Sequence, residues 1–267
     1  MRAFAEVVKL RFKVYFQYRW SFGMALFIQP FLLLINVALF RSIYAYNGGG
    51  TIKGYGLEQM IWYITAVFFV LAFMLNFADR NISNKVLTGE LVMDLLRPMS
   101  VFRFELATAI ALRSVGVIME FVPGIFIYSL IYYPTFLTLL SVMKFIAVVI
   151  LAFFLFYLIN FLIGLLAFAI KSNSSVASIK MVVIWLFGGA YIPLEFFPGW
   201  INRIASALPF KYMFYYPVHI FLNMDNVSGW DAFLRIVGMQ LVWITVLYVA
   251  CKALWRAAIH KFCAVGG

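Results

Sequence analysis

The run VMKFIAVVILAFFLFYLINFLIGLLAFAI, residues 142–170, decides the class of fold, because Lys144 is its only charged residue. As an α-helix it exceeds the about 20 residues that cross a bilayer core of about 30 Å. Other long apolar runs occur along the chain, and short polar connections separate them. We therefore predict an all-α, polytopic membrane protein with a single transmembrane domain over residues 1–267. Six spans are expected, at 21–40, 60–78, 107–131, 142–170, 178–194 and 233–254.

Composition supports this class of protein. Hydrophobic residues make up 66% of the chain and charged residues 12%, whereas a soluble domain keeps about a quarter of its residues charged. The net charge of +11 is explained by basic residues that face an anionic membrane leaflet. Nucleic-acid binding is therefore not required to account for the charge, and no nucleic-acid partner is expected.

The placement of lysine and arginine predicts the orientation of the spans. With both termini in the cytoplasm, fourteen of these residues face the cytoplasm, six face outside, and Arg113 lies within a span. Cytoplasmic loops of membrane proteins carry an excess of lysine and arginine. We therefore predict a multi-pass protein of the inner (cytoplasmic) cell membrane with both termini in the cytoplasm.

Residues 1–20 read as an amphipathic helix at the membrane interface. With a period of 3.6 residues, Arg2, Glu6, Lys9 and Lys13 share a polar face, and the opposite face is largely apolar. Such a helix lies along the headgroup boundary. The alternative is a helix that continues without interruption into the first span.

The segment GELVMDLLRPMS, residues 89–100, is a polar interruption between the second and third spans. Leucines at four-residue spacing predict one apolar helix face, and the charged side chains lie off it. Such a helix suits a protein groove, although it could also rest on the inner leaflet, and Gly89 can divide it into two short helices. We assign residues 79–104 as a cytoplasmic segment whose candidate partner-contacting residues are Leu87, Gly89, Glu90, Leu91, Asp94, Leu95, Arg97 and Pro98.

A second unusual region precedes the last span. Four prolines fall within GGAYIPLEFFPGWINRIASALPFKYMFYYPV, residues 188–218, and proline at this frequency prevents a single continuous helix. We predict a re-entrant helical hairpin over residues 193–217 on the outer side, since broken backbone at membrane depth must be covered by protein or water. An ordinary aromatic belt on a loop is the alternative. The hairpin residues singled out are Pro193, Phe196, Phe197, Pro198 and Trp200.

Three charged residues are candidates for a translocation path. Glu120 lies near the middle of the third predicted span, and Arg113 precedes it by seven residues on nearly the same helix face. A charge at that depth must be neutralised, paired or exposed to water. In one interpretation both residues line a route through the protein. In the other, Glu120 bonds a neighbouring span and the Arg113 side chain extends toward the inner membrane interface. Glu195, between two prolines, either gates the outer end of that route or caps the hairpin.

The motifs of common enzymes are missing from the sequence. It contains neither a GxxxxGK[ST] phosphate-binding loop nor HExxH, and its two histidines, His219 and His260, lie far apart. We therefore expect no catalytic residue, no metal site and no cofactor on this chain. Transport, conduction or scaffolding remain as functions.

Two motifs in this order resemble the ABC type-2 permease family, the membrane domains of ATP-binding-cassette exporters. The first is G-x-L-x-x-x-L-L-R-P after the second span, formed by Gly89, Leu91, Leu95, Leu96, Arg97 and Pro98. The second is PLEFFP, at residues 193–198, followed by a short hairpin before the last span. The resemblance covers essentially the whole chain.

The resemblance implies that residues 79–97 form a coupling helix that rests in a cleft of an ATPase subunit. It implies two copies of that ATPase, which hold ATP and magnesium, and a second permease chain, similar or identical, that completes the path. Transport would follow an alternating-access mechanism, with cargo released past the outer hairpin.

Two alternatives from other classes stay open. A secondary transporter or channel without an ATPase would be expected to show interrupted helices in both halves of the chain, and only the region after the fifth span is interrupted. The second alternative is a membrane anchor that transports nothing. The aromatic-rich interior suits lipids, drugs, peptides and glycans alike as cargo.

Overall fold

The computed structural model describes residues 2–170 and 174–259. Helix makes up 82% of the structure, and the part of the chain that it describes contains no β-strand. The prediction of an all-α fold is therefore confirmed.

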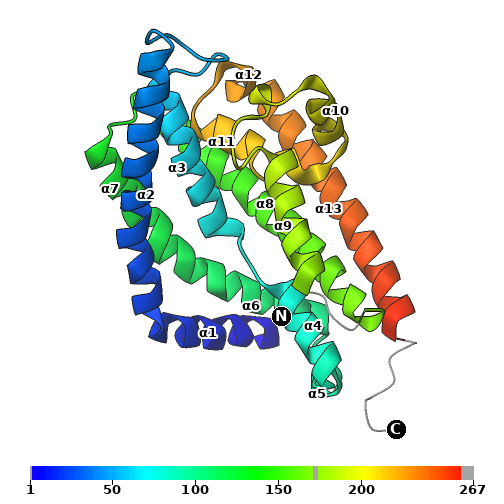
Figure 1. The fold of residues 1–267 in the computed structure, drawn as a ribbon. Coiled ribbons are helices and arrows are strands. Elements are labelled where there is room, and N and C mark those ends of the chain that lie inside the picture. Colours follow the sequence, from blue (N-terminus) through cyan, green and yellow to red (C-terminus); the bar gives the residue numbers. More distant parts are fainter. Residues whose placement is uncertain (1, 171–173, 260–267) are drawn as a thin grey trace.

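Long helices alternate with short ones along the chain (Figure 1). In order they are α1 (Arg2–Gln17), α2 (Arg19–Tyr46), α3 (Leu57–Met74), α4 (Ala78–Thr88), α5 (Leu91–Leu95), α6 (Val101–Gly116), η1 (Val117–Phe121), α7 (Val122–Ile131), α8 (Leu139–Leu165), η2 (Leu166–Phe168), α9 (Ser174–Gly188), η3 (Leu194–Phe196), α10 (Gly199–Ala207), η4 (Pro209–Tyr212), α11 (Tyr215–Phe221), α12 (Asp225–Ser228) and α13 (Trp230–Ile259).

Several helices are long and apolar enough to cross a membrane, so the chain is a multi-pass membrane protein. Within residues 2–170 and 174–259, four stretches meet this criterion: Leu57–Met74, Val101–Ile131, Leu139–Phe168 and Trp230–Ile259. The apolar parts of α2 and α9, Pro30–Tyr46 and Ser175–Gly188, are shorter. Each of the six predicted spans overlaps one of these stretches.

Two of these helices end before the predicted spans do. The second span ends at Met74, not at residue 78, because the chain adopts an extended conformation at Leu75 before α4 begins. Helix α9, which overlaps the fifth predicted span, ends at Gly188 and not at residue 194, because Gly189 has a φ of +76° and turns the chain out of the helix. Hydropathy alone could not show these turns, since the residues beyond them are also apolar.

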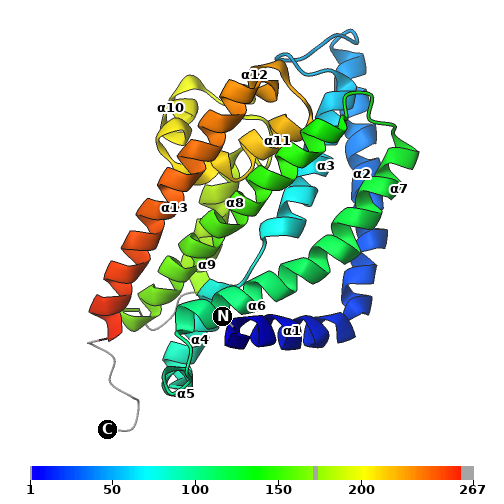
Figure 2. The same cartoon turned by 180° about the vertical axis from the view of Figure 1, so that it is seen from behind.

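The third span begins earlier than predicted and is not one regular helix. The Ser100 hydroxyl accepts a hydrogen bond from the Arg103 amide and caps α6 at Val101, so the end of the 79–104 segment is the first turn of this span. The turn Val117–Phe121 is a π-helix, and Pro123 follows in the first turn of α7. Inserted turns and prolines both bend helices, and the bend between α6 and α7 is visible in Figure 2.

Helix α1 lies across one end of the molecule, nearly perpendicular to α2 (Figure 1). The two helices are separated at Tyr18, so the alternative of one continuous helix is wrong. Helix α1 packs along α6, and its predicted polar face, with Arg2, Glu6, Lys9 and Lys13, is exposed. This geometry suits a helix that lies along a membrane surface.

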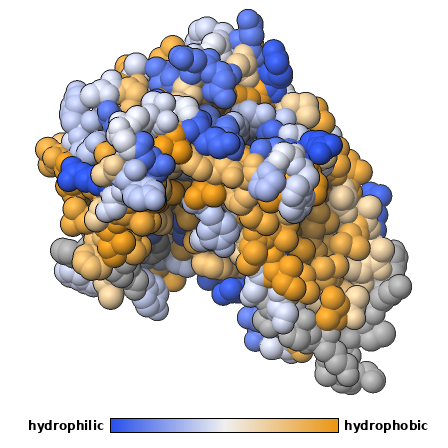
Figure 3. Space-filling model, turned by 45° about the horizontal axis from the view of Figure 1, so that its top comes forward, coloured by the Kyte–Doolittle hydropathy of each residue, from blue (hydrophilic) through white to orange (hydrophobic). Residues whose placement is uncertain are grey.

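Helix α8 is the centre of the helix packing and contacts α3, α4, α11 and α13. Its buried side chains include Phe145, Phe156, Tyr157 and Phe161. Many large apolar side chains on the outer faces of α2, α7 and α13 are exposed, as expected of surfaces that meet lipid. Figure 3 shows hydrophilic residues over the end that carries α10–α12 and broad hydrophobic surfaces beside it.

Candidate functional site

Helices α4 and α5 project from the same end of the molecule as α1 (Figure 1). Gly89 ends α4 with a φ of +78°, a conformation that glycine adopts without strain, and the chain then turns into α5. The division into two short helices at Gly89 is therefore confirmed. Helix α5 has five residues, too few to be stable alone, so contacts with the rest of the protein must hold it.

The prediction of one leucine face along this segment is wrong. Leu91 is fully buried, whereas Leu87 and Leu95 are each 43% exposed. The four-residue spacing does not keep these side chains on one face, because the helix is interrupted at Gly89. The large apolar side chains that the segment exposes form the exposed apolar set, Leu87, Met93, Leu95 and Leu96.

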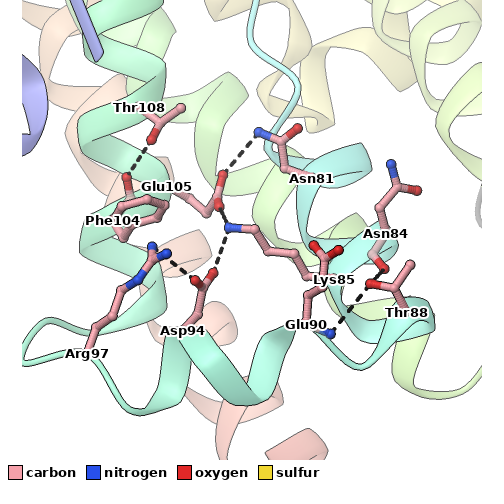
Figure 4. A network of polar contacts seen from close by, with 10 residues as sticks. All are labelled: Asn81, Asn84, Lys85, Thr88, Glu90, Asp94, Arg97, Phe104, Glu105 and Thr108. Carbon is pink, nitrogen blue, oxygen red and sulfur yellow. Dashed lines mark hydrogen bonds and ion pairs between the residues drawn. The ribbon is translucent and has the colours of Figure 1, made fainter. Parts of the chain in front are cut away.

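A cluster of charged side chains attaches α5 to α4 and α6 (Figure 4). Lys85 Nζ lies 2.6 Å from Asp94 Oδ2 and 2.5 Å from Glu105 Oε1. Asn81 donates to the other oxygen of Glu105 at 3.2 Å. Asp94 also pairs with Arg97 at 3.0 Å, and the Arg97 guanidinium lies 4.3 Å from the centre of the Phe104 ring.

Asp94, a candidate partner-contacting residue, is buried and pairs within the internal cluster, so a partner cannot reach it. Glu90 and Pro98 are exposed, as a partner-contacting residue must be. Burial acts to lower the pKa of Lys85, but the nearby carboxylates Glu105 and Asp94 outweigh it and raise the pKa above its ordinary value. Lys85 is therefore a cation at neutral pH, and its link between α4, α5 and α6 is ionic.

A second polar network joins α4 to the interior. Lys180 Nζ on α9 lies 2.5 Å from Asp79 Oδ2 and 2.5 Å from Asn160 Oδ1 on α8. The Asn160 amide in turn donates to the Asn76 backbone and side-chain oxygens at 2.9 and 3.0 Å. The network thus joins α4, α8, α9 and the extended link after α3.

Sequence reasoning missed this network. Its signal was present, since Asp79, Lys180 and Asn160 are polar residues at the ends of, or inside, apolar runs. Lys180 lies at the start of the fifth predicted span, and only the fold shows that its side chain points to Asp79.

At the opposite end, Glu195 belongs to a cluster that we name the outer tether: Tyr55, Glu195, Tyr215 and His219. The Tyr55 hydroxyl lies 3.0 Å from Glu195 Oε2 and 2.7 Å from His219 Nε2, and the Tyr215 hydroxyl donates to Glu195 Oε1. His219 Nδ1 lies 2.7 Å from the Tyr215 carbonyl oxygen. The outer tether connects the loop before α3 to the predicted hairpin and to α11.

The Tyr55 hydroxyl faces two acceptors in the outer tether. A carbonyl oxygen only accepts, so Nδ1 of His219 carries a proton and Nε2 of the neutral ring is an acceptor. The Tyr55 hydroxyl has one proton but faces two acceptors, Nε2 and the Glu195 carboxylate. The hydroxyl can therefore donate to only one of these two acceptors at a time.

The predicted hairpin, residues 193–217, contains three short helical elements before α11 begins. They are η3, α10 and η4, after which the chain turns inward through α11, whose residues Pro217–Phe221 are all buried against α3 and α8. Of the singled-out hairpin residues, Trp200 and Pro198 are exposed, Phe196 and Phe197 are half-buried, and Pro193 is buried.

Arg113 and Glu120 form no direct ion pair with each other, although their charges interact electrostatically. Arg113 is buried, and its Nη1 donates to the carbonyl oxygens of Leu71 and Ala72 at 3.3 and 3.4 Å, where α3 ends. Glu120 lies in the π-helical turn and is half-buried, and within the described part of the chain it forms no ion pair. Of the candidate path residues, Arg113 is occupied in holding the end of α3.

The fold and these clusters define a multi-pass helical membrane protein. It has an exposed apolar segment, α4–α5, at one end and the outer tether at the other. Residues 32–266 match the family model described as ABC-2 family transporter protein. Because this match covers most of the chain, the protein belongs to the ABC-2 transporter family, and the predicted resemblance is confirmed. Comparison with curated proteins and with solved structures gives no match.

Proposed function

We propose that this chain is the membrane-spanning permease subunit of an ATP-binding-cassette exporter. In this proposal a second permease chain, similar or identical, completes the translocation path. Two separate ATPase subunits hold ATP and magnesium and drive transport.

The observation that carries the proposal is the combination of exposure and attachment in α4 and α5. A helix that docks on a partner must present side chains outward, as Leu87, Met93, Leu95 and Leu96 do. To transmit motion it must also be joined rigidly to the spans. The Lys85 cluster joins it to α6, and Lys180 joins it to α8 and α9.

The proposed topology has six spans, formed by α2, α3, α6–α7, α8, α9 and α13, in the inner membrane. Both termini are cytoplasmic, as the excess of lysine and arginine indicates. The common placement of α1 and α4–α5 at one end supports this arrangement, because an interfacial basic helix and an ATPase-docking segment both belong on the cytoplasmic side.

Glu120 is our candidate for the translocation path, because a half-buried carboxyl inside a span must be paired or must contact water. We propose that it faces the interface between the two permease chains. Glu195 acts at the outer end, where opening of the outer tether would release the hairpin and let cargo leave.

Co-purification tests this function. The intact chain is isolated from its native membrane in mild detergent, and chains retained with it are identified by mass spectrometry. We expect an ATP-binding subunit with a phosphate-binding loop. The variant L95D/L96D should retain at least about tenfold less of this subunit, because the contact would bury two charges.

The matched control is L95M/L96M, which keeps both positions apolar and should retain the ATPase. Thermal unfolding of both variants checks that the permease itself is intact. Reproducible isolation without any ATP-binding chain, or equal retention by L95D/L96D, would contradict the proposal.

A further inference from the structure

A cavity of about 1000 Å³ lies where the first turn of α1 meets the start of α6, the end of α8 and the last third of α13. Its walls are mainly apolar and include Phe4, Phe102, Phe161 and Trp255. It does not belong to the polar clusters described above. A cavity of this size is within the range that holds small amphiphilic ligands.

Two positive charges stand at this cavity, Arg103 on α6 and Lys252 on α13. Both side chains are exposed, and no acidic residue lines the cavity. Among the described residues neither forms an ion pair, and Lys252 Nζ lies 5.0 Å from the centre of the Tyr248 ring. The first turn of α1 adds backbone N–H groups that have no partner within the helix and the positive end of its dipole. The cavity therefore favours an anion beside its apolar walls.

The position of the cavity favours a lipid as the source of that anion. Tyr248 belongs to the outer surface of α13, where Leu241, Val242 and Val249 are also exposed as on a lipid-facing helix. Helix α1 lies across the same end of the molecule, as a helix at a membrane boundary would. An acyl chain can enter from the bilayer while its headgroup stays level with Arg103 and Lys252.

We propose that this cavity holds one resident anionic phospholipid per chain. Its phosphate binds between Arg103 and Lys252, and an acyl chain packs along Phe102, Phe161 and Trp255. The lipid thereby fixes α1 against α6 and α13. This inference requires the membrane location but not the proposed coupling to an ATPase.

Lipid titration of the purified full-length chain tests the site. Phosphatidylglycerol or phosphatidylcholine is added in detergent, and bound lipid is counted by native mass spectrometry while thermal unfolding is followed. We expect one phosphatidylglycerol per chain and a rise in Tm that phosphatidylcholine does not produce. R103Q/K252Q should bind it roughly thirtyfold more weakly, since each basic residue near the headgroup contributes about fivefold and the two contributions multiply.

Two further variants make the result specific. K53Q/R203Q removes the same charge from exposed positions at the opposite end and should bind like the wild type. A5W adds a large ring to an exposed cavity-lining position without changing charge, and should lose the lipid even if R103Q/K252Q fails to fold.

Titration with inorganic phosphate distinguishes a lipid headgroup from free phosphate as the bound anion. It should not raise Tm by itself, because the apolar walls would remain unfilled. Three results would overturn the proposal: equal stabilisation by phosphate alone, equal binding of phosphatidylcholine, or unchanged phosphatidylglycerol binding in A5W and R103Q/K252Q.

Discussion

Lys180 is the residue at which three helices meet in the interior. Its ammonium group contacts Asp79 on α4 and Asn160 on α8, and only 7% of its side chain is exposed. An ion pair at such a site contributes little net stability compared with an apolar pair, but removal of one partner leaves a buried charge. The pair is therefore suited to holding α4 in one position relative to α8 and α9.

Replacement of Lys180 by methionine should destabilise the protein by about 3 kcal/mol, because Asp79 would lose its cation in a buried site. Denaturant unfolding in detergent measures this loss. The double variant D79N/K180M should recover more than half of it, since no unpaired charge remains. Equal stability of the wild type and K180M would show that the pair does not hold α4.

Tyr55 has the corresponding role at the opposite end, where its hydroxyl contacts both Glu195 and His219. Y55F removes these contacts and leaves the Glu195 carboxylate with fewer donors, a loss of about 1.5 to 3 kcal/mol for a hydrogen bond to a charged group. Backbone hydrogen exchange in residues 194–221 should then be at least about tenfold faster. Y46F is the control, because Tyr46 is 92% exposed, and an equal change in Y46F would contradict the assignment.

Sequence reasoning at this scale found Gly89 and Glu195 but misplaced Leu91 and Asp94. Gly89 and Glu195 carry local signals, a glycine inside a helical pattern and a carboxylate between two prolines. Leu91 and Asp94 depend on how α5 folds back after the turn, and Lys85 and Lys180 on partners distant in sequence. Periodicity describes one helix at a time, so it could not supply these pairings.

At the scale of the elements, α4 packs tightly against α8. A Cβ atom built at Gly164 would stand 2.9 Å from the Ile82 Cβ and 3.2 Å from the backbone of Asp79. Only a glycine permits this approach without displacement of α4. The approach also brings Asp79 within reach of Lys180 and Asn160.

The variant G164A should therefore push α4 away from α8 and destabilise the protein by about 1 to 3 kcal/mol, as overpacking does. The same unfolding assay applied to G238A provides the control. A Cβ at Gly238, inside α13, meets nothing within 4 Å, so this change should be neutral or slightly stabilising. Equal unfolding curves for the two variants would mean that the α4–α8 contact tolerates a methyl group.

Prediction from sequence was most successful for the existence of the elements and less so for their ends. Long apolar runs determined where helices lie, because the hydrophobic effect acts over whole segments. The ends depended on single groups, such as the Ser100 cap of α6 and the positive φ of Gly189. The π-helical turn at Val117–Phe121 has no recognisable sequence pattern, whereas Pro123 inside the predicted third span was a signal for the bend that the prediction did not use.

For the whole molecule, the features that carry the proposal lie at opposite ends. Helices α1, α4 and α5 share one end, and the outer tether lies at the other (Figure 1). Helix α8 contacts α4 near the first and α11 near the second, so one rigid element connects them. This continuity gives a physical route by which movement of α4–α5 could reach the outer hairpin.

The central claim, that α4–α5 docks on an ATPase, is tested most directly by site-specific photo-crosslinking in native membranes. A photoreactive amino acid replaces Leu96, which is 76% exposed at the end of α5, and in a parallel sample Tyr46 at the opposite end. We predict that position 96 captures a chain with an ATP-binding phosphate loop and that position 46 does not. Capture of lipid alone at position 96, or of the same ATP-binding chain from both positions, would contradict the account.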